Sequence, residues 1–163
     1  MQKITPFLWF DDQAEEAAKF YVSLFKNSKI LSMPRYGEAG PGPKGSVMVV
    51  SFQLAGQNFM ALNGGPQFTF SLAISFVVSC KTQKEVDFFW RKLGRGGETN
   101  RCGWLKDKYG VSWQIVPTVL GQLMASKDRE KANRVMEAML KMHKLDIRRL
   151  KQAAAASPRK QRA

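Results

Sequence analysis

Aromatic side chains on expected strands, together with carboxamides near strand ends, are the residues of this sequence best suited to contact a small molecule. An apolar wall with a few polar groups is typical of pockets that bind a small aromatic or hydroxylated ligand. Aromatic strand residues also fill protein cores, so we expect one or two of these rings to line a pocket and the others to be buried. The ligand-binding candidates are Trp9, Phe52, Asn63, Phe76, Trp104, Trp113 and Gln114.

Residues that act as nucleophiles or bases are scarce. The sequence has one histidine, His143, and two cysteines, Cys80 and Cys102. His143 lies in an expected C-terminal helix, where an imidazole is more often a surface or packing group than a catalytic one. Two cysteines make neither a disulfide framework nor a four-thiolate zinc site. We therefore assign no catalytic residue and expect both thiols to be reduced.

The glycine-rich stretch over residues 37–45 does not have the form of a nucleotide-binding turn. It contains Pro41 and Pro43 and leads into a strand. Common S-adenosylmethionine enzymes place such a turn between a parallel strand and a helix. The stretch also lacks the Gly-Lys-Ser/Thr ending of a phosphate-binding loop. We interpret it as a loop at the mouth of a cleft.

The elements that must position these residues occur in the same order twice. Asp12 and Thr82, each followed three residues later by Glu, predict a capping box at the start of two helices that are 70 positions apart. Apolar spacing of three and four predicts the helices, and apolar-rich runs predict the strands. Strands are expected over 3–10, 30–36, 46–54, 57–62, 72–79, 102–106 and 111–116, and helices over 13–25 and 83–93.

The pattern becomes purely helical after Pro117. Methionines at positions 124, 136, 139 and 142 recur along these segments. Methionine stripes are usually adaptable core, so we expect them to pack on the sheet or on a partner chain. The domain prediction is a first module over 3–66, a second over 70–117, a helical extension over 118–150 and a disordered basic tail over 151–163.

The net charge of +13 is concentrated near the C-terminus. Residues 127–163 hold twelve Lys and Arg against four Asp and Glu, whereas residues 1–126 hold fourteen against nine. A basic segment of this kind binds nucleic acid or another anionic surface through the release of counterions. A solvated helix face explains the same charge, so we regard nucleic acid as a possible but less favoured partner.

Hydrophobic residues make up 44% of the sequence, which is typical of a globular protein. No apolar run approaches the roughly 20 residues that span a bilayer, and the N-terminal residues lack the apolar segment of a secretory signal. We expect a cytoplasmic protein with no membrane partner.

Three separated segments resemble one protein family. They are residues 4–10 (ITPFLWF), 14–21 (AEEAAKFY) and 103–117 (GWLKDKYGVSWQIVP). In order and spacing they are similar to the PhnB-like branch of the vicinal oxygen chelate superfamily, which includes glyoxalases, bleomycin-resistance proteins and dioxygenases. Members of this branch are often labelled 3-demethylubiquinone-9 3-methyltransferase. The resemblance covers about residues 3–150.

The resemblance implies an α+β fold of two βαβββ modules, whose curved mixed sheets enclose a cleft. Catalytic members of the superfamily hold a metal there with His, Glu or Gln on the first and last strands of each module, and the metal acts as a Lewis acid. The positions that match these ligands are Thr5, Met60, Ser75 and Gln114. Divalent metals prefer imidazole and carboxylate ligands, so we predict neither a metal nor another cofactor.

Three functions are compatible with these features, and the sequence leaves open whether the protein is an enzyme. The first is a homodimeric small-molecule-binding protein of this superfamily without the usual metal ligands. The second is an enzyme, either a transferase of the labelled type or a metal-dependent lyase or dioxygenase-like protein. The third is a basic protein that associates with nucleic acid.

Overall fold

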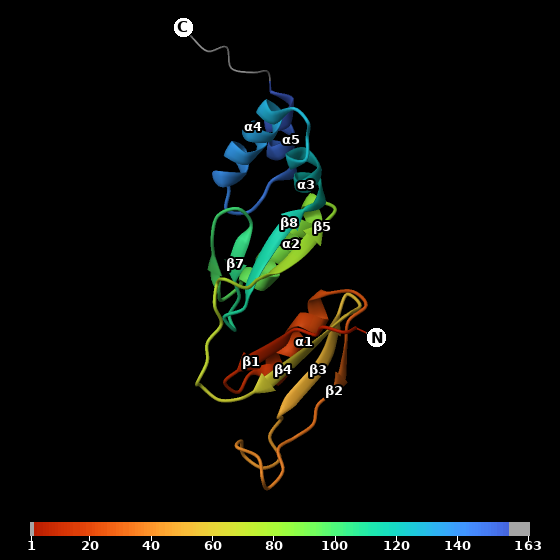
Figure 1. Cartoon of the computed structure of the whole chain (residues 1–163), viewed down its shortest axis with the longest axis vertical. Helices are drawn as coiled ribbons and strands as arrows, with labels where there is room; N and C mark the ends of the chain where they lie inside the picture. The colour runs from red at the N-terminus through yellow and green to blue at the C-terminus, as the bar shows by residue number, and fades with distance from the viewer. Residues whose placement is uncertain (1, 157–163) are drawn as a thin grey trace. The chain divides into compact units, whose positions relative to one another are not determined.

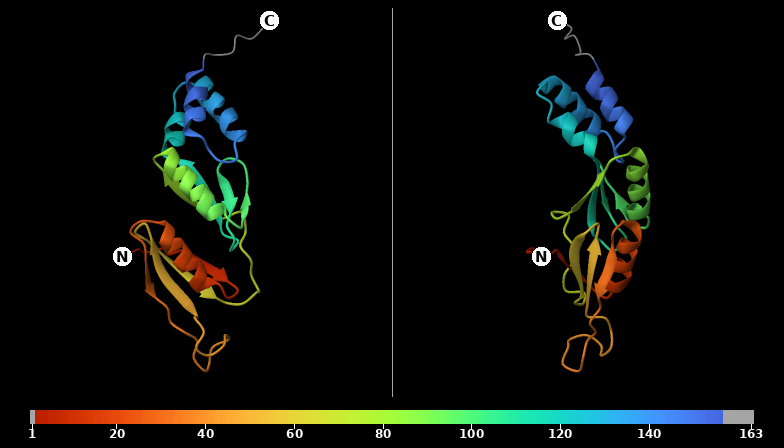
Figure 2. Two further views of the ribbon diagram at one scale, coloured as in Figure 1. Left: turned by 180° about the vertical axis from the view of Figure 1, so that it is seen from behind. Right: turned by 90° about the vertical axis from the view of Figure 1, so that its right-hand side faces the viewer.

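The computed structural model describes residues 2 to 156 of the chain. The chain divides into two compact units, Met1–Phe70 and Ser71–Ala163. Each unit contains one four-stranded sheet, and each sheet is covered by a helix on one face (Figures 1 and 2). The fold is therefore α+β with a repeated module, as the sequence predicts.

The two sheets have the same topology. In the first unit the order along the sheet is β1-β4-β3-β2, and in the second it is β5-β8-β7-β6. The first and last strands of each unit pair in parallel, and the other neighbours pair antiparallel. The first unit consists of β1 (Phe7–Phe10), α1 (Ala14–Leu24), β2 (Lys29–Ser32), β3 (Val49–Leu54) and β4 (Gln57–Asn63). The second repeats this order with β5 (Phe76–Cys80), α2 (Gln83–Gly94), β6 (Glu98–Thr99), β7 (Trp104–Lys106) and β8 (Ser112–Pro117).

Strand alternation sends one set of side chains toward the helix and the other set to the opposite face. In β3, Val50, Phe52 and Leu54 are buried beneath α1, while the residues between them are only half-buried. In β8, Trp113 and Ile115 are buried, and Gln114 between them is half-buried. We call the sheet face turned away from the helix the open face.

The two predicted capping boxes have different outcomes. At α2 the box forms, because the Thr82 hydroxyl accepts from Glu85 N and the Glu85 carboxylate accepts from Thr82 N. At α1 the prediction is wrong, since the N-cap is Gln13 and its side chain makes no capping bond. The carboxamide of Asn63, at the end of β4, accepts from Ala14 N instead.

The C-terminal extension forms three helices, α3 (Thr118–Met124), α4 (Arg129–Leu140) and α5 (Ile147–Ala155). Its core contains Leu120, Val135, Met142, Leu145, Leu150 and Ala154, with Met124 and Met139 packed against it. Most of the methionines thus pack within the extension, whereas Met136 is 37% exposed. Asp128 and Asp146 cap α4 and α5 by accepting from Lys131 N and Arg149 N.

Several element boundaries differ from the predictions; β1, β3 and β5 begin three or four residues later than expected, at Phe7, Val49 and Phe76. The short strand β6 was not predicted, because Glu98 and Thr99 carry no apolar pattern and pair only through the backbone with β7. The expected strand over 30–36 ends at Ser32, followed by an isolated bridge between Arg35 and Val47. Helix α5 continues to Ala155, so the start of the predicted tail over 151–163 is helical; residues 157–163 of that tail lie outside the described residues.

None of the helices within residues 2–156 has the length and apolar character that a bilayer crossing requires.

Candidate functional site

The strand register sorts the seven candidate residues onto two different faces. Trp9 has the same alternation as Phe7 on β1, and Trp104 lies directly opposite Gln114 across the β7–β8 pair. These three candidates, Trp9, Trp104 and Gln114, lie on the open faces of their own sheets. Phe52, Asn63, Phe76 and Trp113 have the opposite alternation and face the helices.

The open face of the second unit carries a polar pair next to an aromatic ring. Gln114 Nε2 donates to the Ser75 hydroxyl at 2.9 Å. Trp104 is half-buried and directly opposite Gln114 in the register. The bond to Ser75 holds the carboxamide in one orientation. The face therefore offers a fixed amide and an indole side by side.

Ser112 is a residue of this face that the sequence analysis missed. It lies two positions before Gln114 on β8, so the two side chains leave the strand on the same face. Its hydroxyl is buried and, among the described residues, has no hydrogen-bond partner. A buried hydroxyl without a partner is unfavourable unless water or a ligand satisfies it. The polar alternation of Ser112 and Gln114 between apolar neighbours was the available sequence signal.

Exposed apolar side chains occupy matching positions in the two units. Phe7 lies opposite Met60 in β4 and is 52% exposed, and Val77 lies opposite Gln114 in β8 and is 57% exposed. Both residues lie on edge strands of their sheets, and large exposed apolar side chains on a sheet face are typical of surfaces that contact a ligand or a partner. Trp9, on the same face as Phe7, donates from its indole nitrogen to Gly65 O at 2.9 Å and packs against Phe68.

The helix-facing aromatic candidates are part of the cores. Phe52 is fully buried and stacks on Phe59 with a centroid distance of 5.5 Å. The rings of Phe76 and Trp113 contact each other with a centroid distance of 5.4 Å, and Trp113 is 3% exposed. Their positions stabilise the sheets and keep these rings away from the open faces.

Asn63 has four hydrogen bonds within its own unit. Its carboxamide accepts from Ala14 N at 2.7 Å and donates to Val47 O at 3.0 Å. Its backbone oxygen accepts from the Tyr36 hydroxyl, and its backbone nitrogen donates to Met48 O. The side chain joins the helix, β4 and the segment before β3.

The turn that precedes β8 is organised by a buried carboxylate. Asp107 is 2% exposed, and its Oδ1 accepts from Tyr109 N and Val111 N. Its Oδ2 accepts from the indole nitrogen of Trp113 at 2.8 Å. These bonds set the direction in which β8 leaves the turn, and they therefore place Gln114 on the open face.

The four positions that match the superfamily's metal ligands carry side chains that divalent metals seldom choose. Ser75 and Gln114 bond to each other, and Thr5 and Met60 lie at the corresponding places of the first unit. Two hydroxyls, a thioether and a carboxamide lack the carboxylate and imidazole donors that divalent metals prefer. Within residues 2–156, no group of three or more His, Cys, Asp and Glu side chains is arranged to hold a metal ion.

The cysteines and His143 do not form a nucleophilic pair. Both thiols are free, Cys80 is buried, and the Cys102 thiol lies 3.8 Å from Met139 O. The backbone oxygen of His143 accepts from Gly103 N, while its imidazole is on the surface.

Burial, aided by the charge of Glu85, raises the pKa of the Cys80 thiol to about 12. At pH 8 only about one Cys80 in 10,000 is then a thiolate, the form that reacts with alkylating reagents. We expect iodoacetamide to modify Cys102 in the folded protein and Cys80 only after unfolding in urea. Peptide mapping by mass spectrometry measures both sites. Rapid modification of Cys80 without urea would contradict this expectation.

Comparison with known proteins identifies the family of this chain. The sequence model of the family described as 3-demethylubiquinone-9 3-methyltransferase matches residues 2–116. The chain belongs to this family. The match confirms the resemblance to the PhnB-like branch, but it ends before the helical extension, whereas the sequence resemblance was expected to continue to about residue 150.

The chain is also similar to proteins of known structure. A Bacillus cereus PhnB protein, which carries the same methyltransferase description, is 44% identical with a TM-score of 0.67; the match covers 72% of this chain and 100% of that one. Protein PA1353 of Pseudomonas aeruginosa is 20% identical with a TM-score of 0.60, over 72% of this chain and 98% of that one, and shows the shared fold. A glyoxalase/bleomycin resistance protein of Albidiferax ferrireducens is 15% identical with a TM-score of 0.44, over 67% and 92% of the two chains. No curated protein matches the chain.

Proposed function

We propose that this member of the family binds a small aromatic or hydroxylated molecule on the open sheet faces, without the superfamily's usual metal. The observation that carries the proposal is the Gln114–Ser75 hydrogen bond beside Trp104. The oriented carboxamide supplies a polar contact, and the indole supplies an apolar surface for a ring. The buried Ser112 hydroxyl supplies a second polar group on the same face.

The proposal includes a cytoplasmic homodimer. The exposed Phe7 and Val77, on the edge strands β1 and β5, support an assembly that covers part of the open faces, because exposed apolar side chains on a sheet face often mark a contact surface. The two free thiols agree with a reducing compartment. The edges of the modules and the methionine-containing helix α4 are the interfaces that we propose.

A methyltransferase reaction, as in the family description, is the alternative function. It requires a site for the methyl donor. The glycine-rich loop over 37–45 packs around the buried Tyr36, whose ring lies within 2.4 Å of the place where a Cβ would stand at Gly40 or Gly42. This packing gives the loop a structural role, and no other feature of the described residues favours a nucleotide turn.

A native mass spectrum of the gently purified, untagged protein is the direct test. It reports the number of chains, any bound metal and any retained organic molecule in one measurement. We expect a dimer that carries an organic molecule and no stoichiometric metal. A stoichiometric metal, or retained S-adenosylmethionine, would replace this proposal with the enzyme alternative.

Replacing Gln114 with leucine is expected to lower the affinity for the retained molecule at least tenfold, because the variant removes the amide while keeping a side chain of similar size. Stability should change by less than about 1 kcal/mol, since only the Ser75 bond is lost. Gln57→Leu, at an exposed position of β4, is the matched control. The occupancy in native mass spectra, with thermal unfolding alongside, measures both effects. Equal occupancy in the two variants would remove Gln114 from the site.

A further inference from the structure

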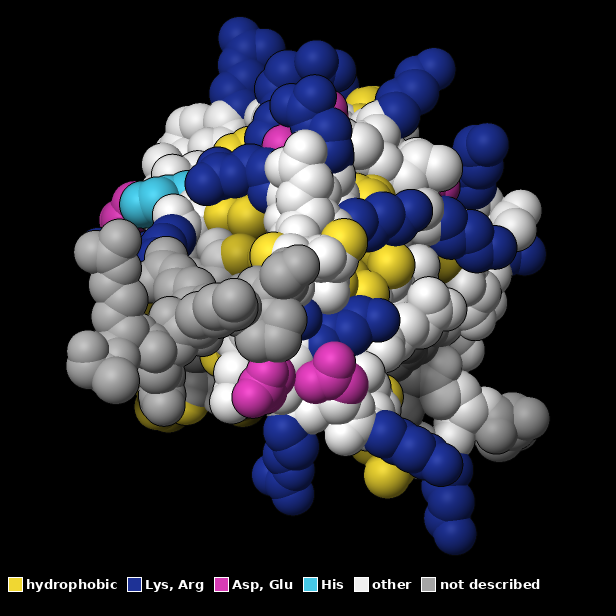
Figure 3. All heavy atoms as spheres, turned by 90° about the horizontal axis from the view of Figure 1, so that it is seen from above, with side chains coloured by type: hydrophobic (Ala, Val, Ile, Leu, Met, Phe, Trp, Pro, Cys, Tyr) yellow, Lys and Arg dark blue, Asp and Glu magenta, His cyan; other side chains and the backbone are white. Residues whose placement is uncertain are grey.

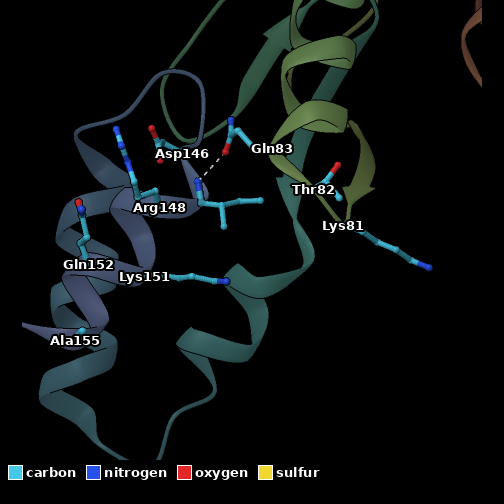
Figure 4. A pocket seen from close by; sticks show the side chains of 9 residues that line it. Lys81, Thr82, Gln83, Asp146, Arg148, Lys151, Gln152 and Ala155 are labelled. Carbon is cyan, nitrogen blue, oxygen red and sulfur yellow. Dashed lines mark hydrogen bonds between the residues drawn. The ribbon is translucent and has the colours of Figure 1, made fainter.

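A groove in the second unit lies apart from all of the ligand-binding candidates. It has a volume of about 750 Å³ and separates the start of α2 from α5 (Figure 4). Its lining residues are Lys81, Thr82, Gln83, Asp146, Ile147, Arg148, Lys151, Gln152 and Ala155. We call this feature the α2–α5 groove.

Direct bonds between α2 and the extension hold the two sides of the groove in place. Gln83 Oε1 accepts from Ile147 N at 2.8 Å, and Gln83 Nε2 donates to Leu145 O at 3.1 Å. Lys144 pairs with Asp87 of α2 at 2.6 Å. The side chain of Gln83 on α2 thus forms hydrogen bonds both with the segment before α5 and with the first residue of α5. The groove is a fixed feature of the second unit.

Three cationic residues are among those that line this groove. Lys151 extends from α5 across it, Arg148 stands on the first turn of α5, and Lys81 extends from the opposite rim toward solvent (Figure 4). Among residues 2–156, none of the three forms an ion pair with a carboxylate. Asp146 is the one acidic residue of the lining, and its Oδ1 already accepts from Arg149 N.

The backbone amides at the two helix starts are largely used within the protein. Thr82 and Glu85 complete the capping box of α2, and Lys81 N donates to the Glu85 carboxylate. At α5, Ile147 N is bonded to Gln83. Any anion in the groove is therefore held by the cationic side chains at its rim. Solvent-exposed cationic side chains bind a polyanion well, because it contacts several of them at once. A single small anion contacts few of them and is readily replaced by water.

The unit that contains the groove carries a wider excess of positive charge. Residues 71–163 hold twenty Lys and Arg against eight Asp and Glu, whereas residues 1–70 hold six against five. The face viewed from the end that carries the extension shows Lys and Arg side chains as the dominant charged groups (Figure 3). The net charge of the protein therefore belongs almost entirely to the unit that contains the groove.

The groove and the extension also lack aromatic side chains. Residues 118–163 contain no Phe, Tyr or Trp, and none lines the groove. Proteins that favour single strands combine a basic groove with aromatic side chains, and each stacked base contributes about 1–3 kcal/mol. Without them, affinity comes from phosphate charge, which is denser along a duplex than along a single strand.

We propose that the α2–α5 groove, with the basic surface of the extension, binds the phosphate backbone of duplex nucleic acid without reading its sequence. Lys81, Arg148 and Lys151 contact phosphates. Binding is driven by counterion release and falls steeply with salt. This activity is independent of the small-molecule site, which lies on the open sheet faces.

Fluorescence anisotropy with the full chain and a labelled duplex of about 20 base pairs tests the proposal, because each phosphate contact adds about −0.9 to the slope of log affinity against log salt. Three contacts alone lower the affinity about 40-fold between 50 and 200 mM KCl. We expect the triple variant K81Q/R148Q/K151Q to make the slope less steep by about 2 to 3. A single strand of the same length should bind more weakly than the duplex.

The triple variant K3Q/K26Q/K29Q is the matched control. It lowers the net charge by the same amount at exposed positions of the first unit. Thermal unfolding of both variants checks the fold, since the three groove side chains make no hydrogen bond among the described residues. An equal loss of affinity in the two variants would overturn the assignment to the groove. Tighter binding to single strands, or to vesicles of phosphatidylserine and phosphatidylcholine, would overturn the duplex as the partner.

Discussion

Replacing Asp107 with alanine is expected to lower the free energy of unfolding by about 3–5 kcal/mol. The carboxylate is 2% exposed and accepts from two backbone amides and from the indole of Trp113. Alanine leaves these donors without an acceptor in a buried place, and it also leaves a small cavity. Urea unfolding followed by tryptophan fluorescence measures the change, and Trp113 itself reports on the turn.

Two further variants separate the role of this carboxylate from a general effect of charge. Asp107→Asn keeps an oxygen for the backbone amides but turns an amide donor toward the Trp113 indole, so we expect an intermediate loss of about 2 kcal/mol. Asp12→Ala removes an exposed carboxylate that does not cap α1, and its stability should stay within about 0.5 kcal/mol of wild type. A similar stability for Asp107→Ala and Asp12→Ala would contradict the role of the Asp107 turn.

The substitution Asn63→Leu is expected to lower the free energy of unfolding by about 2–3 kcal/mol, because it removes a helix cap and a bond to Val47 O together. Far-UV circular dichroism in urea follows the loss of α1, and the melting temperature gives the overall effect. Asn63 was predicted to contact the ligand, and its four internal bonds suggest a structural contribution that the measurement can separate.

Asn63→Asp provides that separation. Aspartate keeps the acceptor for Ala14 N and places a negative charge at a helix start, which is favourable, but it loses the donor to Val47 O. We expect it to recover at least half of the stability lost in Asn63→Leu and to retain the small molecule in native mass spectra. Loss of the molecule from a stable Asn63→Asp protein would return Asn63 to the ligand site.

The position of the Gln114–Ser75 pair depends on the Asp107 turn, and this dependence can be tested. Asp107 sets the path of β8, and β8 carries Gln114. Variants at Asp107 therefore affect both stability and binding, whereas Gln114→Leu affects mainly binding. This difference distinguishes residues that hold the strand from residues that contact the ligand.

Much of the candidate site was within reach of the sequence once the strands were assigned. The alternation of Val50, Phe52 and Leu54 with polar neighbours already places Phe52 under a helix. In β8 the same alternation separates Trp113 from Gln114. The predicted group of aromatic strand residues includes residues of both sheet faces. Period-two alternation, a local property of the backbone, separates them.

The repeat of helix and strands, the Thr82 capping box and the helical extension follow from local patterns of residues, and the sequence alone determined them. Their hydrogen bonds join residues within a few positions, so short segments contain the necessary information. The cap of α1 by Asn63, 49 residues away, was decided by the tertiary structure. The same holds for the bonds of Gln83 to Leu145, before α5, and to Ile147, its first residue, 62 and 64 positions away. Such contacts depend on strand register and helix docking, which arise only when distant segments pack together.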